Sequence, residues 1–327
     1  MAEKMQITII GLGMIGASAG LALRRYQDKV LLVGHDPDPA RAGKAKQMGA
    51  VDRTEWNLIN AVVKADRVLL TLPAGALREV LELIGPELKP GCLVVDTADV
   101  KAPVLEWAVK YLPDTVSFIG GHPIVLAENM DTASARADLF DKKLFCLIPS
   151  ERASDRSLNL AVDLAQAMGA QPFFLDAIEH DGLAAAVSQL PLVMAGALMS
   201  IASGSSGWGD MRKLAGSQFY SGTWVAEDDY KGAAGTCLAN QKYLTHWIDR
   251  LIEELELWKE QIVAGAQEEL AKKLEAGQSA ASAWVRAQAQ GVWEEPLPMS
   301  DLPSSGAYMR QMIGLGGWGR RPEKPKK

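Results

Sequence analysis

Three glycines near the start of the chain have the spacing of a dinucleotide-binding turn. Gly11, Gly13 and Gly16 follow an apolar, β-branched run, and small and apolar residues come after them. In such a turn the first glycine permits the tight bend, the second lets the backbone approach a pyrophosphate, and the third lets helix and strand pack closely. The N–H groups at the start of the following helix attract phosphate. We therefore predict a cofactor site at these glycines and at Met14 and Ile15.

An acid follows the next predicted strand. Asp36 lies about 20 residues beyond Gly16, where a carboxylate accepts hydrogen bonds from an adenosine ribose. A carboxylate there repels a 2′-phosphate, so NAD is favoured over NADP, although Arg41 and Lys44 follow soon after and could partly offset that preference. The alternative is an ordinary strand–helix turn in which Asp36 caps the helix that begins near Pro37.

One histidine is the candidate for proton transfer. His122 directly follows a predicted strand, and Gly120 and Gly121 before it would let a ligand or cofactor come close. An imidazole titrates near neutral pH and suits general acid–base work. The alternative is a structural histidine that caps a turn. Leu72 and Pro73 end another predicted strand at the same edge, where ligands bind in such sheets, so we predict that they contact the cofactor.

The elements that must position these residues alternate between strand and helix in the first half of the chain. Short apolar runs predict strands, and amphipathic patterns between them predict helices such as 74–83, 104–112 and 154–168. This alternation predicts a mostly parallel, doubly wound α/β sheet of the Rossmann type, with helices on both faces. We place this domain at residues 1–176. The predicted strands are 6–10, 30–34, 67–72, 92–96, 117–120, 144–148 and 171–175.

The second half of the chain shows little strand signal after Asp176. Helical periodicity covers 179–203, 210–214, 229–274 with breaks, and 280–289, which predicts an all-α domain at 177–290. Such a domain often supplies a substrate cleft and a dimer interface. Its apolar stripe is explained equally well by a homodimer contact or by burial within one chain. Residues 291–327 form a Pro/Gly-rich extension that we predict to be partly disordered. The stripe consists of Leu244, Trp247, Ile248, Leu251, Leu255 and Trp258.

Composition excludes several broad classes of function. The chain has 327 residues, a net charge of −6 and a pI of about 5.4, which argue against binding to nucleic acid or to an anionic membrane. Its three cysteines and four histidines lack metal-ligand spacing. We therefore expect free thiols, no metal site, a small-molecule substrate and a cytoplasmic location. The longest later apolar run, 190–202, contains Pro191 and is too short to span a bilayer.

Further motifs resemble those of the prephenate and arogenate dehydrogenases of tyrosine biosynthesis. They occur in order over residues 5–290, and they join the glycine turn and Asp36 to four other segments. These segments are Asp96-Thr-Ala-Asp-Val-Lys101, Gly120-Gly-His-Pro123 with Glu128, Glu179-His-Asp181 leading to Ser188-Gln-Leu-Pro191, and Leu214-Ala-Gly-Ser-Gln-Phe219.

The resemblance implies oxidative decarboxylation of a cyclohexadienol with NAD or NADP, carried out by a homodimer. Hydride would leave the carbon that bears the ring hydroxyl, His122 would accept the proton of that hydroxyl, and loss of carbon dioxide would make the ring aromatic. Asp99 stands where the family has a serine that helps to hold the histidine and the substrate, and an aspartate there could accept a hydrogen bond from His122. Asp99 is thus the second predicted catalytic residue, and Ser188, Gln189 and Trp224 are predicted substrate contacts.

Two segments depart from the family pattern. The family's Ser-His-Leu-Pro-His is Ser188-Gln-Leu-Pro-Leu192 here, and its Phe-Arg-Asp-x-Thr-Arg is Phe219-Tyr-Ser-Gly-Thr-Trp224. Two histidines are lost, together with the arginine that grips a substrate carboxylate. Truncating such a contact costs about 2–5 kcal/mol. Arg212 or Lys213 could replace the lost charge.

Three functions fit these observations. The first is an NAD-dependent dehydrogenase of the prephenate or arogenate type with an altered carboxylate grip. The second is a dehydrogenase on the same scaffold that acts on a less anionic, more apolar substrate, which Leu192, Tyr220 and Trp224 favour. The third is a non-catalytic NAD-binding protein that interacts through its C-terminal extension. The sequence leaves the substrate, the dimer geometry and any feedback regulation open.

Overall fold

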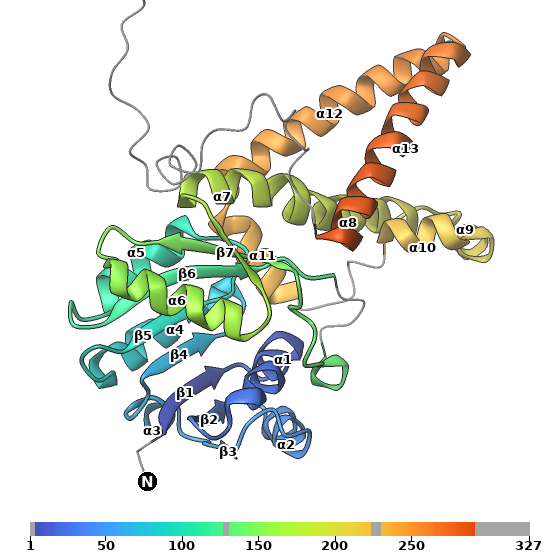
Figure 1. Cartoon of the computed structure of the whole chain (residues 1–327). Coiled ribbons are helices and arrows are strands. Elements are labelled where there is room, and N and C mark those ends of the chain that lie inside the picture. Colours follow the sequence, from blue (N-terminus) through green and yellow to red (C-terminus); the bar gives the residue numbers. More distant parts are fainter. Residues whose placement is uncertain (1–3, 127–130, 224–229, 292–327) are drawn as a thin grey trace, which may run out of the picture. The chain divides into compact units, whose positions relative to one another are not determined.

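The computed structural model describes residues 4–126, 131–223 and 230–291. The chain divides between Val263 and Ala264 into two compact units. Within the described residues, the first unit contains an eight-stranded sheet with the strand order β3-β2-β1-β4-β5-β6-β7-β8 (Figure 1). The strands are β1 (Met5–Ile10), β2 (Val30–His35), β3 (Arg53–Thr54), β4 (Arg67–Leu70), β5 (Leu93–Asp96), β6 (Ser117–Pro123), β7 (Leu144–Pro149) and β8 (Gln171–Phe174).

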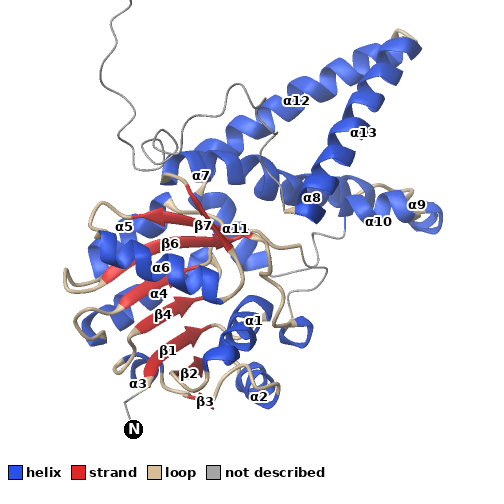
Figure 2. Cartoon of the chain, viewed as in Figure 1, coloured by secondary structure: helices blue, strands red, loops and turns tan. Residues whose placement is uncertain are grey.

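Apolar cores lie on both faces of this sheet. Strands β1 to β6 run parallel, whereas β7 runs antiparallel to β6 and parallel to β8. Ile9 belongs to the core under α1 and α6, and its neighbour Ile10 belongs to the core under α4 and α5, because successive strand residues face opposite sides. Figure 2 shows the strands between these helices. The helices are α1 (Met14–Leu23), α2 (Pro39–Gln47), α3 (Leu58–Val62), α4 (Ala74–Ile84), α5 (Ala102–Tyr111) and α6 (Asp155–Ala167), with short 3₁₀ turns at Arg24–Tyr26, Gly85–Glu87 and Thr132–Ser134.

The predicted fold class is confirmed. All seven predicted strands are present, with ends that differ by three residues at most. The pattern missed β3, because a strand of two residues has no periodicity to detect.

The helical part of the first unit begins with one continuous helix. Helix α7 (Ala177–Ala184), a π turn (Ala185–Gln189) and α8 (Leu190–Ser203) run together over 27 residues, and an 18-residue stretch of them has a mean hydropathy of 1.7. By length and composition alone this helix could cross a membrane. The apolar helix is thus longer than the run 190–202 on which the sequence-based argument relied, and the expectation that this segment does not span a membrane stays a prediction. Pro191 occupies the first turn of α8, where its missing N–H and fixed φ do not break the helix. Buried Asp181 and Gln189 nevertheless tie the first half of this helix to the sheet domain by hydrogen bonds.

Four further helices complete the described part of the first unit. They are α9 (Trp208–Leu214), α10 (Ser217–Thr223), α11 (Tyr230–Ala239) and α12 (Gln241–Val263). The predicted apolar stripe lies along α12. Leu244 is buried at one end of the stripe, whereas Leu255 is 56% exposed at the other. In the second unit, the described residues form helix α13 (Gln267–Gln290), which ends at Gly291 in the left-handed conformation. The predicted extension at 292–327 lies outside the described residues.

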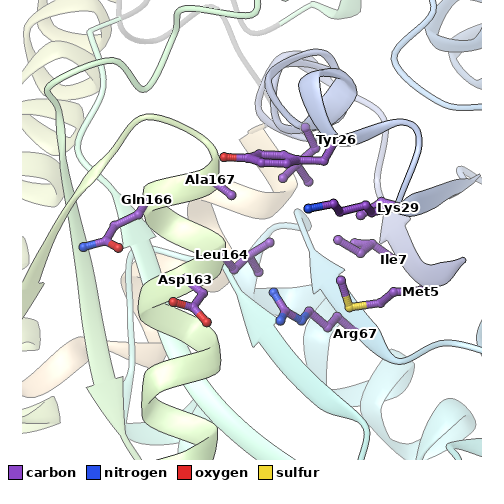
Figure 3. A pocket seen from close by; sticks show the side chains of 11 residues that line it. Met5, Ile7, Tyr26, Lys29, Arg67, Asp163, Leu164, Gln166 and Ala167 are labelled. Carbon is purple, nitrogen blue, oxygen red and sulfur yellow. The ribbon is translucent and has the colours of Figure 1, made fainter.

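A cavity of about 360 Å³ opens at the amino edge of the sheet, where β1 and β4 begin (Figure 3). Its floor is apolar and includes Ile7 and Leu164. Around the floor stand Tyr26, Lys29, Arg67, Asp163 and Gln166. This edge is opposite to the carboxyl edge, where the residues predicted for chemistry lie.

Candidate active site

The glycine turn joins β1 to α1 and has the conformation that its spacing predicts. Gly11 has a φ of +91°, and a Cβ atom there would lie 2.4 Å from the carbonyl oxygen of Thr71. A Cβ atom on Gly16 would lie 2.0 Å from the carbonyl oxygen of Gly11. Side chains are therefore excluded at both positions, and strand and helix pack backbone to backbone.

The first turn of α1 is suited to an anion. Its N-cap is Gly13, no side chain caps the helix, and no acid lies in the first turn, so its N–H groups are open to a phosphate. The side chain of Met14 is buried and that of Ile15 is partly buried, so contact with a cofactor would come from their backbone. These residues fit the pyrophosphate of a dinucleotide.

Asp36 is held against this turn. It is 6% exposed, its Oδ2 accepts a hydrogen bond from the N–H of Leu12 at 2.7 Å, and its Oδ1 accepts one from the N–H of Asp38 at 2.8 Å. Each carboxylate oxygen keeps a further lone pair that a ribose hydroxyl can use. Leu72 lies against Gly11, and Pro73 is the N-cap of α4. Both residues are thus at the carboxyl edge, and their contact with a cofactor stays a prediction.

A chain of three side chains leads from His122 into the helical part. The Nδ1 atom of His122, at the end of β6, lies 2.9 Å from Nε2 of His180 on α7. The Nδ1 atom of His180 lies 2.9 Å from Oδ1 of Asp181. The N–H groups of Lys101 and Ala102 donate to the two oxygens of Asp181 at 2.6 and 2.8 Å. This chain fixes the position of the His122 ring.

A buried ion pair holds the strand end next to His122. The Nζ atom of Lys101 donates to Oδ2 of Asp96 and, at 2.7 Å, to the carbonyl oxygen of Gly121. Asp96 also accepts the N–H of Gly121 at 3.0 Å and that of Ala98 at 2.9 Å. Both side chains are fully buried. Because Gly121 precedes His122, these bonds hold the strand end that carries the histidine.

The electrostatic environment keeps His122 neutral. Burial, the neighbouring His180 and the positive charge of Lys101 hold the pKa of His122 well below its usual 6.5. A neutral imidazole has one bare nitrogen and can accept a proton. Burial raises the pKa of Asp99. Its Oδ1 accepts from the hydroxyl of Thr236 at 3.4 Å, a long hydrogen bond.

The other predicted site residues have different surroundings. Among the described residues, His122 forms its hydrogen bond with His180 and not with Asp99, so the expected contact between the two predicted catalytic residues is absent. Gln189 is buried in the π turn, where its amide donates to the carbonyl oxygen of Asp99 at 3.3 Å and accepts from Asn240 at 2.8 Å. Ser188 lies beside it and is partly exposed. π turns of this kind frequently occur at functional sites. Trp224 and Glu128 lie outside the described residues.

Several residues of this network were not predicted as site residues. His180 and Asp181 belonged to a motif shared with the family, but no role was predicted for them. Lys101 ended another such motif, and no role was predicted for it either. A buried acid next to a histidine was the available signal. Asn240, which also donates to the carbonyl oxygen of Asp181 at 2.8 Å, gave no signal at all. Within the described part of the chain, no cluster of His, Cys, Asp and Glu could hold a metal ion.

Two family models match most of the chain. The model of the prephenate dehydrogenase nucleotide-binding domain matches residues 19–173, and that of the prephenate dehydrogenase dimerization domain matches 176–276. The cyclohexadienyl dehydrogenase of Zymomonas mobilis is 30% identical over 252 residues, which are 76% of this chain and 85% of that protein. The prephenate dehydrogenase of Bacillus subtilis is 26% identical over 60% of this chain, and the match spans only 53% of that protein.

Solved structures agree with these matches. Prephenate dehydrogenase from A. aeolicus, in complex with hydroxyphenyl propionate and NAD+, has a TM-score of 0.78 and 25% identity, and the match covers 86% of this chain and 98% of that one. Arogenate dehydrogenase from Synechocystis has a TM-score of 0.69 and 25% identity, covering 86% of this chain and all of that one, 100%.

Proposed function

The chain belongs to the prephenate dehydrogenase family, and from this premise we propose that it is an NAD-dependent dehydrogenase that oxidatively decarboxylates a cyclohexadienol of the prephenate or arogenate type. The observation that carries the proposal is His122, a neutral base at the carboxyl edge of the sheet that also bears the glycine turn. NAD, when bound, takes up the hydride from the carbon that bears the ring hydroxyl.

The side chains of this protein would manage the proton. His122 accepts the proton of the ring hydroxyl as that carbon becomes a carbonyl. The ring carboxylate then leaves as carbon dioxide, its electron pair enters the ring, and the carbonyl oxygen regains a proton as the ring becomes aromatic. Lys101 and Asp96 hold the strand end during both steps. Asp99, at the family's serine position, is proposed to face the same reaction space, and burial raises the pKa of its carboxyl group.

Activity with the two natural cyclohexadienols tests this proposal. Purified protein is mixed with NAD and either prephenate or arogenate, and NADH is followed by its absorbance. Turnover with either substrate supports the proposal. If neither reacts while NAD binding is measured in the same preparation, the proposed substrate class is wrong.

The proposed preference for NAD has its own test. Asp36→Ser removes the charge that repels a 2′-phosphate, so the ratio of the NADP to the NAD dissociation constant should fall. The variant also loses acceptors for the N–H groups of Leu12 and Asp38, so NAD itself should bind less tightly. Asp36→Asn keeps one carbonyl acceptor and is the matched control. An unchanged ratio in Asp36→Ser would mean that Asp36 is not at the ribose.

A less anionic substrate is the second candidate function. Tyr220, which is 65% exposed on α10, stands at the first of the two arginines in the family's Phe-Arg-Asp-x-Thr-Arg segment. Asp99 also places an acid where the family has a serine. A panel of cyclohexadienols and cyclic alcohols without the second carboxylate would reveal this activity. The remaining alternative, a non-catalytic NAD-binding protein, predicts NAD binding without turnover of any member of the panel.

We also propose that the protein is a cytoplasmic homodimer. The dimerization-domain match and the exposed apolar side chains of α8, which include Leu198 and Ile201, support the homodimer. The buried free thiols of Cys92 and Cys146 support a reducing compartment. Sedimentation of the purified protein tests the oligomeric state, since a monomer at micromolar concentration would contradict it.

A further inference from the structure

We infer that His180 and Asp181 are positioning residues that order the protons along their chain, so that His122 carries its proton on Nδ1 and presents a bare Nε2 to the substrate. The inference concerns the same site as the proposed function, and its kinetic consequence rests on that function. Its structural content, the position of one proton, does not.

Asp181 sets the donor-to-acceptor direction of the hydrogen bonds that link it to His180 and His122. Its two oxygens accept the N–H groups of Lys101 and Ala102, and Asp181 is 1% exposed. Hydrogen bonds to the charged form stabilise a carboxylate, and a carboxylate is only an acceptor. The 2.9 Å contact between Asp181 and Nδ1 of His180 is therefore a hydrogen bond that the imidazole donates.

The next hydrogen bond follows from this one. A neutral imidazole has a single N–H group. When His180 donates from Nδ1, its Nε2 has a lone pair, and the 2.9 Å contact with His122 must be donated by Nδ1 of His122. The ring planes are inclined by 71° and the ring centroids lie 5.1 Å apart, so the two nitrogens 2.9 Å apart face each other at the ring edges, as an N–H···N hydrogen bond requires. The Nε2 atom of His122 is then the bare nitrogen.

The other charges around His180 agree with this direction. Lys101 and Asp99 are the charged groups that interact with the two histidines from the segment between β5 and α5. The charge of Lys101 opposes a positive charge on His122 and is already paired with Asp96. Asn240, between α11 and α12, donates to the backbone carbonyl oxygen of Asp181 and to Gln189 but not to the Asp181 carboxylate, so it does not change the direction of these hydrogen bonds.

The ordering matters because an isolated neutral imidazole prefers to carry its proton on Nε2. In that form His122 would present a donor, and it could not accept the proton of a substrate hydroxyl. The chain of His180 and Asp181 selects the opposite form before substrate binds, which is a form of preorganisation. A substitution that breaks the chain leaves the His122 side chain in the protein but moves its proton to the wrong nitrogen.

The experiment measures the proton position directly. The protein is labelled with ¹⁵N in its histidine rings, and nitrogen shifts distinguish protonated from bare nitrogens at pH about 8, where an ordinary histidine is neutral. The chain has four histidines, so single substitutions assign every signal. We expect His122 in the wild type to be protonated on Nδ1. In His180→Phe, which fills a similar volume, its proton should move to Nε2.

Kinetics provide the second readout. His180→Phe should lower kcat about 100-fold, at the low end of what a positioned base contributes, with KM and NAD affinity within about twofold. His180→Gln has a carbonyl that accepts from Nδ1 of His122, so it should recover part of the lost rate and the Nδ1-protonated form. Exposed His246→Gln is the matched control and should change neither readout.

Two results would overturn the inference. One is a wild-type spectrum with the His122 proton on Nε2. The other is a folded His180→Phe variant in which proton position and kcat are unchanged. If His180→Phe does not fold, the wild-type spectrum and His180→Gln still decide. If no substrate reacts at all, the proposed function fails, whereas the spectra continue to support or contradict the proton order.

Discussion

The two edges of the same sheet differ in how firmly their polar side chains are held. The amino edge has a cavity of about 360 Å³ with an apolar floor and polar side chains around it, and the side chain of Arg67 there has no hydrogen bond or ion pair within the described residues (Figure 3). At the carboxyl edge, Asp96, Lys101, His180 and Asp181 are each at most 3% exposed, and each forms at least two hydrogen bonds. The cavity and the hydrogen-bonded polar side chains thus lie at opposite ends of the strands.

The difference teaches that fixed polar groups are the better sign of catalysis in this fold. Burying a charge is costly unless partners replace its water. At the carboxyl edge the backbone and side chains supply those partners, and the result is a neutral histidine with a defined orientation. Exposed side chains around the amino-edge cavity have no comparable constraint, so substitutions at the two edges should have unequal effects.

The largest effect should come from the base itself. His122→Ala removes the proton acceptor and should lower kcat by about 10²- to 10⁴-fold with little change in NAD affinity. Wild-type activity should stay level as pH falls through 6.5, because the lowered pKa of His122 keeps it unprotonated there. Steady-state rates measure both, with His246→Ala as the exposed control. A rate loss below tenfold would remove His122 from the mechanism.

Breaking the buried ion pair should be the next largest effect. Lys101→Met leaves the charge of Asp96 without its cation, which should lower the free energy of unfolding by about 3–5 kcal/mol. Denaturant titration measures this value. The double variant with Asp96→Asn should recover part of the loss, since no unpaired charge remains. A loss under about 1 kcal/mol would contradict the importance given to this pair.

Asp99 should give a smaller effect with a defined pH dependence. Because its pKa is raised in the folded protein, folding favours its protonated form, and stability falls as pH rises from the usual 3.8 through the raised pKa. Asp99→Asn should therefore be more stable than the wild type at neutral pH. The difference should vanish in acid. Melting temperatures across pH test the sign, and a less stable variant at neutral pH would refute it.

The smallest effect is expected at the amino edge. Burial lowers the pKa of Arg67, against the opposing charges of Asp163 and Asp66, so its charge gives the fold little. Arg67→Met should change the free energy of unfolding by no more than about 0.5 kcal/mol and leave kcat and KM unchanged. Steady-state rates and the free energy of unfolding of Arg67→Met are measured and compared with those of Lys101→Met. An altered KM would mean that the amino edge takes part in function after all.

The sequence predicted what depends on local pattern. The strands, the glycine turn and the place of His122 after β6 follow from alternation, glycine spacing and a strand end, each within about ten residues. The contact of His122 with His180 joins positions far apart in the chain, and no periodicity encodes it. The helix predicted at 179–203 is present and continues across Pro191, because proline in a first helical turn is tolerated.

The same limit explains the substrate side of the site. The predicted pairing of His122 with Asp99 followed from family resemblance, but the structure gives His122 a different partner. Gln189 was predicted to contact substrate, and the structure shows its amide between Asp99 and Asn240, where only the folded chain could place it. Its contact with substrate stays a prediction.

The buried Lys101 has a consequence for engineering. The hydrogen bonds of Lys101 and of Asp181 connect the residues that hold His122. A designer therefore cannot replace one of these residues without disturbing the others. Ser188 and Leu192 form none of these bonds and lie on the adjoining π turn and the first turn of α8. Because Ser188 is a predicted substrate contact, we expect a library confined to such positions to vary substrate choice while leaving the bonds that hold His122 intact.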